Sequence, residues 1–241
     1  MTPYYEDADA GITIYHARCE DVLPSIDPAT VDLLLTDPPY GIERGKSLRS
    51  REVRDVNHLD GLGWNDKPSD WLRIAEPAMK TEAWLGEWSG AAPVEAHRCL
   101  ESAKRFGFSS YHTFMLVKRN PPPGLNPTFT ASLEACWLFR RGRPKFQHPR
   151  GTMVPNWYSV TLGGPRLHPA QKPLGAVRVI VEALVPRDGL VLDPFMGSGP
   201  IAQACHELGR RYIGIELVED YCRIAVSRLS QQTLDLTGGP A

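Results

Sequence analysis

The sequence predicts an α/β fold in which a mostly parallel sheet is flanked by helices. Apolar runs of strand length alternate with amphipathic runs of helix length, and glycine and proline residues separate them. No internal repeat is present. With 241 residues, of which 42% are hydrophobic and 23% charged, the chain suits one soluble globular domain with a sizeable core.

The first part of the chain predicts two strands and a long loop. The β-branched run at 12–15 predicts a strand, and a short helix is expected near 20–23. The apolar run 31–36 predicts a buried strand that ends at Pro38 and Pro39. Residues 41–67 are polar and without a period, which predicts a long loop of the kind that is usually functional or disordered.

The middle and the C-terminal part alternate between helices and strands. In the middle we expect a helix over 69–80 confined by Pro77, a strand over 83–88, a helix over 94–106, and strands over 111–117 and 132–139 joined by a proline-rich turn at 120–127. After it we expect helices over 174–185, 200–208 and 218–229, and strands over 190–193 and 211–215. Residues 1–139 and 168–241 are therefore expected to form a single domain, with 140–167 as a short basic insertion.

The net charge of −1 conceals an uneven distribution. Residues 1–37 carry eight acids and one base, whereas the stretch between Glu134 and Glu182 carries eight bases and no acid. A near-neutral total argues against nucleic-acid binding only if the charge is spread evenly, because phosphate contacts need clustered lysine and arginine. The cluster of basic residues between Glu134 and Glu182 is therefore compatible with nucleic acid as a partner.

Other features narrow the class of protein. The five cysteines are odd in number, widely spaced and never in C-x-x-C, so neither a disulfide framework nor a zinc site is expected, and a reducing cytoplasm is the expected location. The polar, acidic first ten residues do not resemble a signal peptide. No apolar run approaches 18 residues, so no membrane partner is expected.

The first motif is a glycine-bearing turn between a predicted strand and a predicted helix. It runs Asp193-Pro194-Phe195-Met196-Gly197-Ser198-Gly199 and lacks the lysine pattern of a P-loop. Glycines there let the backbone approach a ligand at the carboxyl end of the strand. The next strand ends at Glu216, where a carboxylate can accept hydrogen bonds from ribose hydroxyls. An ordinary tight turn with a surface glutamate is the competing explanation.

The second motif, Asp37-Pro38-Pro39-Tyr40, follows a buried strand directly. Two prolines make a rigid corner that presents a carboxylate, a free carbonyl and an aromatic ring together. These groups suit a planar base with an exocyclic amine, because Asp37 and the Pro38 carbonyl each accept one amine hydrogen while Tyr40 stacks on the ring. The alternative is a rigid strand exit with a solvated aspartate.

Both motifs together resemble those of the S-adenosylmethionine-dependent DNA amino-methyltransferases. Their order, DPPY first and the glycine tract last, is similar to the beta class, whose chain is circularly permuted relative to other classes. The resemblance extends from about residue 12 to residue 229. It includes three further segments, Phe114–Pro121, Leu167–Pro173 and Gly214–Arg228. It implies a Rossmann-like, circularly permuted methyltransferase fold.

Two positions depart from the family pattern. Arg18 stands before Cys19 where the family commonly has an acidic residue, which affects the expected contact to the cofactor's adenine. Pro200 ends the glycine tract where the family usually has threonine. Proline is acceptable in the first turn of a helix, so the fold is expected to survive while a hydroxyl contact is lost.

The resemblance assigns roles to the motif residues. The expected activity is site-specific methyl transfer from S-adenosylmethionine to adenine N6 in double-stranded DNA, with the target base flipped out of the duplex. Catalysis is assigned to Asp37, Pro38, Pro39 and Tyr40. Cofactor binding is assigned to Asp193, Phe195, Met196, Gly197, Ser198, Gly199, Glu216, Gln171 and Lys172. DNA contact is expected from Arg44, Lys46, Arg49, Arg51, Arg140, Arg141, Arg143, Lys145 and Arg150, and no metal is expected.

Three alternatives remain open at this point. Adenine is favoured because the resemblance associates serine at the position of Asp37 with cytosine-N4 enzymes, so cytosine-N4 methylation is the nearest alternative. A catalytically silent, methyltransferase-like DNA-binding subunit is the second. A dinucleotide-dependent oxidoreductase is disfavoured by the absence of a full G-x-G-x-x-G. A homodimer is open, as is the setting: a restriction-modification system, a phage or a solitary regulator.

Overall fold

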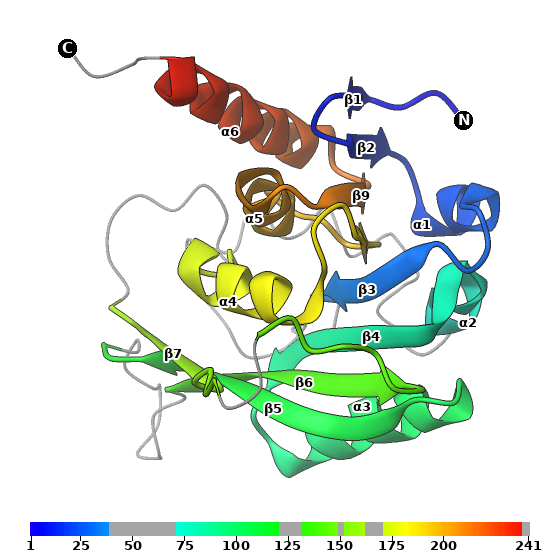
Figure 1. The fold of residues 1–241 in the computed structure, drawn as a ribbon, viewed down its shortest axis with the longest axis vertical. Helices are drawn as coiled ribbons and strands as arrows, with labels where there is room; N and C mark the ends of the chain where they lie inside the picture. The colour runs from blue at the N-terminus through cyan, green and yellow to red at the C-terminus, as the bar shows by residue number, and fades with distance from the viewer. Residues whose placement is uncertain (39–70, 121–131, 149–151, 162–170, 238–241) are drawn as a thin grey trace, which may run out of the picture.

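The structure, a computed structural model, describes residues 1–38, 71–120, 132–148, 152–161 and 171–237. The described residues form one nine-stranded sheet with strand order β1-β2-β9-β8-β3-β4-β6-β5-β7 (Figure 1). The strands are β1 (Tyr5–Asp7), β2 (Ile12–His16), β3 (Val31–Thr36), β4 (Met79–Gly90), β5 (Ser109–Lys118), β6 (Leu133–Arg141), β7 (Trp157–Val160), β8 (Leu190–Asp193) and β9 (Arg211–Glu216). The α-helices are α1 (Cys19–Val22), α2 (Trp71–Ala75), α3 (Pro93–Arg105), α4 (Leu174–Leu184), α5 (Pro200–Leu208) and α6 (Glu219–Thr237).

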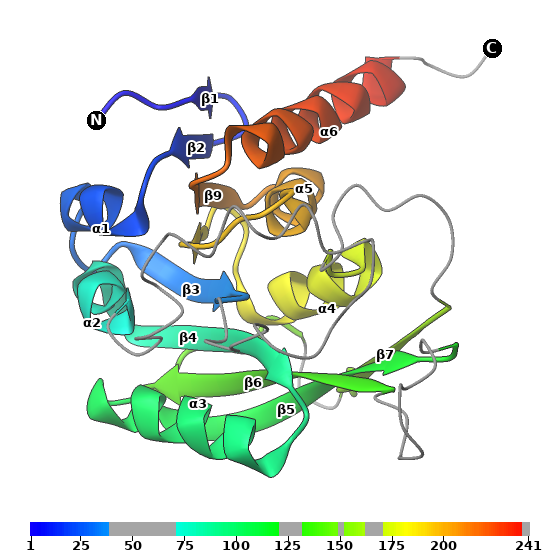
Figure 2. The same cartoon turned by 180° about the vertical axis from the view of Figure 1, so that it is seen from behind.

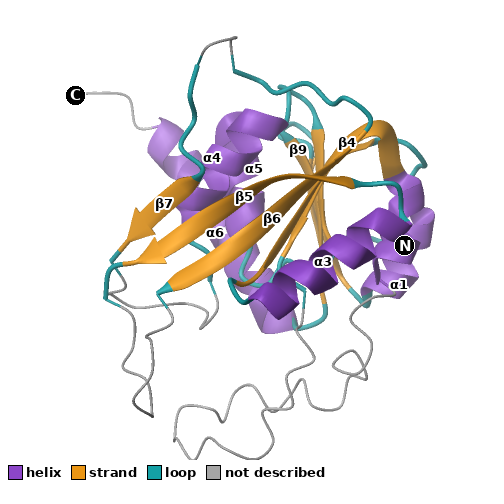
Figure 3. Cartoon of the chain, turned by 90° about the horizontal axis from the view of Figure 1, so that it is seen from below, coloured by secondary structure: helices purple, strands orange, loops and turns teal. Residues whose placement is uncertain are grey.

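Helices cover both faces of the sheet, as Figure 3 shows in projection along it. One apolar cluster joins the sheet to α4, α5 and α6, and the other joins it to α1, α2 and α3. Strand β3 serves both: Leu33 and Leu35 belong to the first cluster and Leu34 to the second. Such burial on two faces is typical of parallel strands covered by crossover helices, and it explains the continuous apolar runs of β3 and β8.

Strand direction changes on both sides of a parallel centre. Strands β2, β9, β8, β3 and β4 run parallel to one another. Strand β1 is antiparallel to β2 at one edge, and β6 runs antiparallel between β4 and β5 on the other side. The register pairs Gly90 with Glu134 and Ala83 with Arg141, so β6 begins at the carboxyl end of β4 and ends near its start. The view from behind shows α3 along β5 and β6 (Figure 2).

Most predicted elements are confirmed. Strand β8 and helix α5 have the predicted bounds, and β2, β3, β9, α3 and α4 agree to within two residues at each end. Pro200 stands in the first turn of α5, so the fold accommodates it as expected. The predicted loop over 41–67 and almost all of the turn at 120–127 lie outside the described residues.

The helix predicted over 69–80 is wrong in its second half. Helix α2 ends at Ala75, a 3-10 turn covers Glu76–Ala78, and Met79 already begins β4. Pro77 explains the change, because proline cannot donate the hydrogen bond that a continuing helix needs.

Two strands were missed, β1 and β7. Strand β7 lies within the predicted basic insertion but pairs in parallel with β5 at the edge of the sheet. It also packs on α4, where a Cβ at Gly175 would lie 2.2 Å from the Tyr158 hydroxyl, so only glycine permits this approach. Strand β1 has three residues, two of them acidic, which gives no apolar alternation to detect.

The cysteines and the helices bear on two further predictions. All five cysteines are buried and carry free thiols, as the expectation of no disulfide framework requires. Among the helices in the described ranges, none combines the length and the apolar character needed to cross a membrane.

Candidate active site

The candidate active site lies where two chain paths diverge in the centre of the sheet. Strand β8 continues through α5 to β9 on one side, while β3 leads to β4 on the other. In open α/β sheets, ligands bind outside the carboxyl ends of the strands at such a switch point. Asp37 follows β3 and Asp193 ends β8, so the two predicted motifs meet there. Pro38 is buried beside them, whereas Pro39 and Tyr40 lie outside the described residues.

The glycine tract turns sharply between β8 and α5. Gly197 and Gly199 have positive φ values of 56° and 75°, which glycine adopts without strain. Gly199 packs closely on α6, since a Cβ there would lie 2.6 Å from that of Ala225. No described atom lies within 4 Å of a Cβ built at Gly197. The first glycine thus faces open space, and the second is needed for packing.

Asp193 lies beneath this turn and orders it. Its Oδ1 accepts hydrogen bonds from the Thr36 hydroxyl at 2.8 Å and the Phe195 N–H at 3.2 Å, and its Oδ2 accepts from the Tyr212 hydroxyl at 3.2 Å. The side chain is 1% exposed, and burial raises the pKa of its carboxyl to about 7. Asp193 was predicted to bind the cofactor. Its three hydrogen-bond donors are all protein groups, so its geometry is that of a residue that orients the glycine turn.

Glu216 ends β9 and points toward the glycine turn. Its Oε2 accepts from the Gly197 N–H and its Oε1 from the Val218 N–H, both at 2.8 Å. Burial raises the pKa of this carboxyl, while the two N–H groups favour its charged form. A carboxylate offers about four lone pairs, so Glu216 is held in place and still able to accept hydroxyl donors.

One polar atom in the turn fits a bound group. The Ser198 side-chain oxygen is buried, and no hydrogen-bond partner for it is found among the described residues. Buried polar atoms are normally satisfied. Ser198 is next in sequence to Gly197, which faces open space, and Glu216 holds a fixed carboxylate at the same turn. A nucleoside-containing cofactor would supply the missing hydrogen-bond partner of the Ser198 hydroxyl, so these residues fit S-adenosylmethionine.

Two predicted cofactor residues have protein partners in this structure. Gln171 accepts a hydrogen bond at 2.7 Å from Arg228 of α6. Lys172 donates to Asp37 Oδ2 at 2.6 Å and forms an ion pair with Glu134 at 3.4 Å. The structure therefore brings Lys172 to the predicted catalytic carboxylate.

The described basic residues of the 140–145 stretch lie away from Asp37. Thr36 pairs with Glu87, whereas Arg141 pairs with Ala83, four residues earlier in β4. At about 3.3 Å per residue this is about 13 Å along the strands. Arg143 and Lys145 follow and are exposed. Their contact with DNA stays a prediction, and it requires a duplex that extends from Asp37 to the end of the sheet where β4 begins. The other predicted DNA contacts, Arg44, Lys46, Arg49, Arg51 and Arg150, lie outside the described residues.

Arg141 has a structural role that the charge pattern did not predict. Its guanidinium pairs with Glu76 and donates to the carbonyls of Met79 at 2.7 Å and Lys80 at 2.7 Å and 3.1 Å. These contacts fasten the end of β6 to the start of β4. They engage the donors that a phosphate would need, so we remove Arg141 from the expected DNA contacts.

Several residues of the site were not singled out from the sequence: Thr36, Tyr212, Glu134 and Lys118. Thr36 carries a local signal, as a hydroxyl at the end of an apolar strand directly before Asp37. The other three come from distant strands, and their roles depend on a register that no local pattern gives.

Comparisons with known proteins agree with this geometry. The family model for DNA methylase (N6_N4_Mtase) matches residues 128–227. The chain is 31% identical to YubD of Escherichia coli (strain K12), whose name describes a methylase, over 88% of this chain and 87% of that protein. It is 28% identical to the type II methyltransferase M2.LlaDCHI of Lactococcus lactis subsp. cremoris, covering 95% and 92% of the two chains.

Solved structures show the same fold. M1.HpyAVI superposes with a TM-score of 0.70 at 23% identity, covering 90% of this chain and 98% of that one. The cytosine-N4-specific PvuII DNA methyltransferase superposes with a TM-score of 0.72 at 16% identity, covering 90% and 86%. The predicted α/β class, a sheet flanked by helices, is confirmed.

Proposed function

This chain belongs to the N6/N4 DNA methylase family, and on that premise we propose that it transfers a methyl group from S-adenosylmethionine to adenine N6 in double-stranded DNA. The observation that carries the proposal is the meeting of Asp37 and Pro38 with the glycine turn at the switch point of the sheet. One motif supplies acceptors for an amine, and the other supplies open space beside a fixed carboxylate.

The cofactor supplies an electrophilic methyl group on a positively charged sulfur. On the protein side, Glu216 is placed to accept ribose hydroxyls, and Gly197 leaves room for close backbone approach. M1.HpyAVI, which shares the fold, has been solved as a complex with this cofactor, with a TM-score of 0.68 at 22% identity to the present chain.

Asp37 and Pro38 activate the target amine. The lone pair of an exocyclic amine is delocalised into the ring, which makes the nitrogen a weak nucleophile. Two hydrogen bonds, one to the Asp37 carboxylate and one to the Pro38 carbonyl, would draw electron density back onto nitrogen and fix the orientation of the amine. Positioning of this kind supplies several kcal/mol, and electrostatic stabilisation of the charge that develops on nitrogen adds to it.

The amine lies inside the duplex, so the target base must be flipped out. Tyr40 is proposed to stack on the flipped base, which is worth about 1–3 kcal/mol on the scale of aromatic platforms. Adenine is preferred because aspartate, and not serine, begins the motif. A cytosine-N4-specific enzyme shares the fold, so the target base must be identified directly.

The decisive experiment incubates the protein with unmethylated DNA and methyl-labelled S-adenosylmethionine and identifies the labelled nucleoside after digestion. Label in N6-methyladenine is expected. Label in N4-methylcytosine would reassign the base, and cofactor binding without label would favour the silent DNA-binding subunit. Asp37→Ala is expected to abolish transfer with the fold intact, as monitored by circular dichroism; substantial retained activity would overturn the mechanism.

A further inference from the structure

Lys172 is an almost fully buried lysine that lies between two carboxylates. Its ammonium group is 2.6 Å from Asp37 Oδ2 and 3.4 Å from Glu134 Oε2. It also lies 5.6 Å from the centre of the Trp88 ring. The side chain is 10% exposed, so these contacts replace most of the water that a lysine normally keeps.

The surrounding charges keep this lysine ionised. Burial alone would lower the pKa of Lys172, but the carboxylates of Asp37 and Glu134 outweigh it and raise the pKa. Burial would likewise raise the pKa of Glu134, but the ammonium groups of Lys172 and Lys118 outweigh it and lower it. Charges of alternating sign therefore follow one another from Asp37 through Lys172 and Glu134 to Lys118.

Each member of this row comes from a different part of the fold. Asp37 follows β3, Lys172 precedes α4, Glu134 begins β6 and Lys118 ends β5. Strands β5 and β6 are paired through this region, with Leu116 opposite Glu134. Because two paired strands hold Glu134 and Lys118, the row links the catalytic corner to a rigid part of the sheet.

We propose that Lys172 is a positioning residue for methyl transfer, which holds the Asp37 carboxylate in the orientation that receives the target amine, with Glu134 and Lys118 fixing Lys172 in turn. This inference rests on the proposed function. It replaces the expectation that Lys172 contacts the cofactor.

The geometry favours positioning over cofactor binding. Of the two carboxylates that Lys172 contacts among the described residues, Asp37 is the nearer, at the short end of charge-assisted hydrogen bonds. A carboxylate has about four lone-pair sites, so Asp37 accepts from Lys172 and from an amine at the same time. A reacting group displaced by about 1 Å can lose about 100-fold in rate. Loss of the lysine therefore acts on the chemical step.

The test compares Lys172→Met, which keeps the apolar stem, with Lys172→Arg, which keeps the charge. For Lys172→Met we expect kcat to fall by about 100-fold or more, with the dissociation constant for S-adenosylmethionine within about threefold of wild type. Lys172→Arg should recover most of kcat. Lys104→Met, on the exposed face of α3, is the matched control and should leave both values unchanged.

A double-mutant cycle separates positioning from general stability. Asp37→Asn keeps an acceptor but loses the charge that Lys172 pairs with. If Lys172 acts through Asp37, Lys172→Met should cost less than about fivefold in kcat in the Asp37→Asn background. Equal losses in both backgrounds would overturn the proposal.

Each remaining outcome is decisive. An unchanged kcat in Lys172→Met, or a weakened cofactor affinity, would overturn the inference and leave the proposed function standing. No transfer by wild-type protein would remove both. If Lys172→Met does not fold, Glu134→Gln provides the test. This variant removes one of the two charges that hold Lys172 but keeps its bond to Asp37, so kcat should fall about tenfold. An unchanged kcat in Glu134→Gln would overturn the inference.

Discussion

The Thr36 hydroxyl donates to Asp193 Oδ1 at 2.8 Å, which joins the residue before the catalytic corner to the residue that opens the glycine turn. The bond crosses from β3 to β8 at the centre of the sheet, and both side chains are buried. Thr36 and Asp193 are 157 residues apart in the chain, and their side-chain contact adds to the pairing of β3 with β8 in fixing the two motifs relative to each other.

Thr36→Val tests this link. It keeps the shape but removes a donor from a buried carboxyl, so the free energy of unfolding should fall by about 1–3 kcal/mol. Urea denaturation followed by circular dichroism measures it. Thr36→Ser retains the donor and should lose clearly less; an equal loss in both variants would show that the methyl group, and not the bond, is what matters.

The raised pKa of Asp193 predicts a dependence of stability on pH. Between the ordinary carboxyl pKa of about 4 and the folded value of about 7, the folded state binds more protons than the unfolded state. Stability from this group is therefore complete at low pH and is lost as pH rises toward 7, by at most about 4 kcal/mol. Asp193→Asn should flatten the slope in denaturation series between pH 4 and pH 8. Parallel wild-type and variant curves would contradict the assignment to Asp193.

The two glycines of the turn should respond differently to alanine. At Gly197 the added Cβ meets open space, so Gly197→Ala should cost about 1–2 kcal/mol from its positive φ alone. Its cofactor affinity, measured by calorimetry, should fall at least about tenfold, because close backbone approach is lost. Gly199→Ala adds a collision with Ala225 and should be less stable than Gly197→Ala. The reverse order of stability would refute this division of roles.

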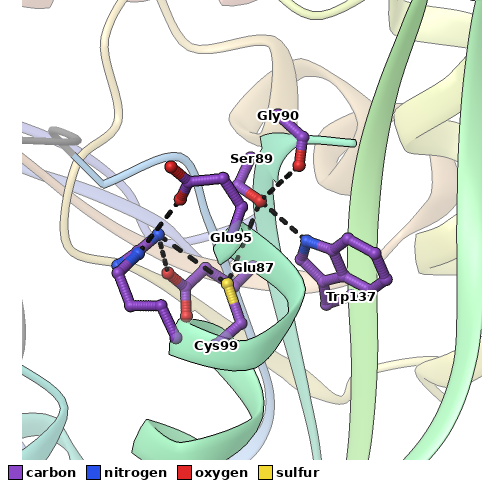
Figure 4. Close-up of polar contacts among 7 residues, drawn as sticks. Glu87, Ser89, Gly90, Glu95, Cys99 and Trp137 are labelled. Carbon is purple, nitrogen blue, oxygen red and sulfur yellow. Dashed lines mark hydrogen bonds and ion pairs between the residues drawn. The ribbon is translucent and has the colours of Figure 1, made fainter. Parts of the chain in front are cut away.

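An ion pair between a half-buried arginine and a buried carboxylate anchors α3 to β4 near the site. Glu87 is 2% exposed and pairs with Arg98 at 3.1 Å, beside the contacts of Ser89 with Trp137 and Cys99 (Figure 4). Burial raises the pKa of Glu87, and Arg98 opposes this. Arg98→Met leaves the carboxylate unpaired and should cost about 3–5 kcal/mol in urea denaturation.

The exposed pair Lys104–Glu101 on the same helix is the matched control for Arg98. Lys104→Met should change stability by less than about 1 kcal/mol. A similar loss for both lysine and arginine variants would mean that burial of Glu87 does not matter.

Arg141 and Arg143 separate fold from DNA contact. Arg141→Ala should lower the free energy of unfolding by about 1–3 kcal/mol, because it leaves Glu76 and two backbone carbonyls without their donor. Its affinity for DNA should remain that of wild type. Arg143→Ala should keep stability and weaken DNA binding, with the salt dependence reduced by about one charge. An unchanged salt dependence would remove Arg143 from the interface.

The sequence predicted the central part of the fold well because local pattern and burial agree there. Strand β8 is a continuous apolar run between Gly189 and Pro194, and helix α5 is an amphipathic run between Gly199 and Gly209. Strand β3 is likewise an apolar run, which leads directly to Asp37. The sequence therefore placed Asp37 directly after β3 and Asp193 at the end of β8, as the structure has them.

The remaining features depend on pairing across long distances. Lys172 and Asp37 are 135 residues apart, and nothing near either residue indicates that they meet. The charge pattern does not distinguish Arg141 from the other basic residues near it, whereas the register of β6 places it near the start of β4. The local sequence shows which residues are charged, but the direction and register of a strand determine at which end of the sheet a charged side chain lies.

The burial of every cysteine has a practical consequence for experiments on this protein. Burial raises the pKa of each thiol, to about 12 for Cys19, Cys99 and Cys222, so native molecules should react slowly with thiol reagents. A single cysteine introduced at an exposed position such as Arg143 would then be the one fast-reacting group. A fluorophore can be attached there without first removing the natural cysteines. The slower reaction of the buried cysteines would measure the rate at which the core opens.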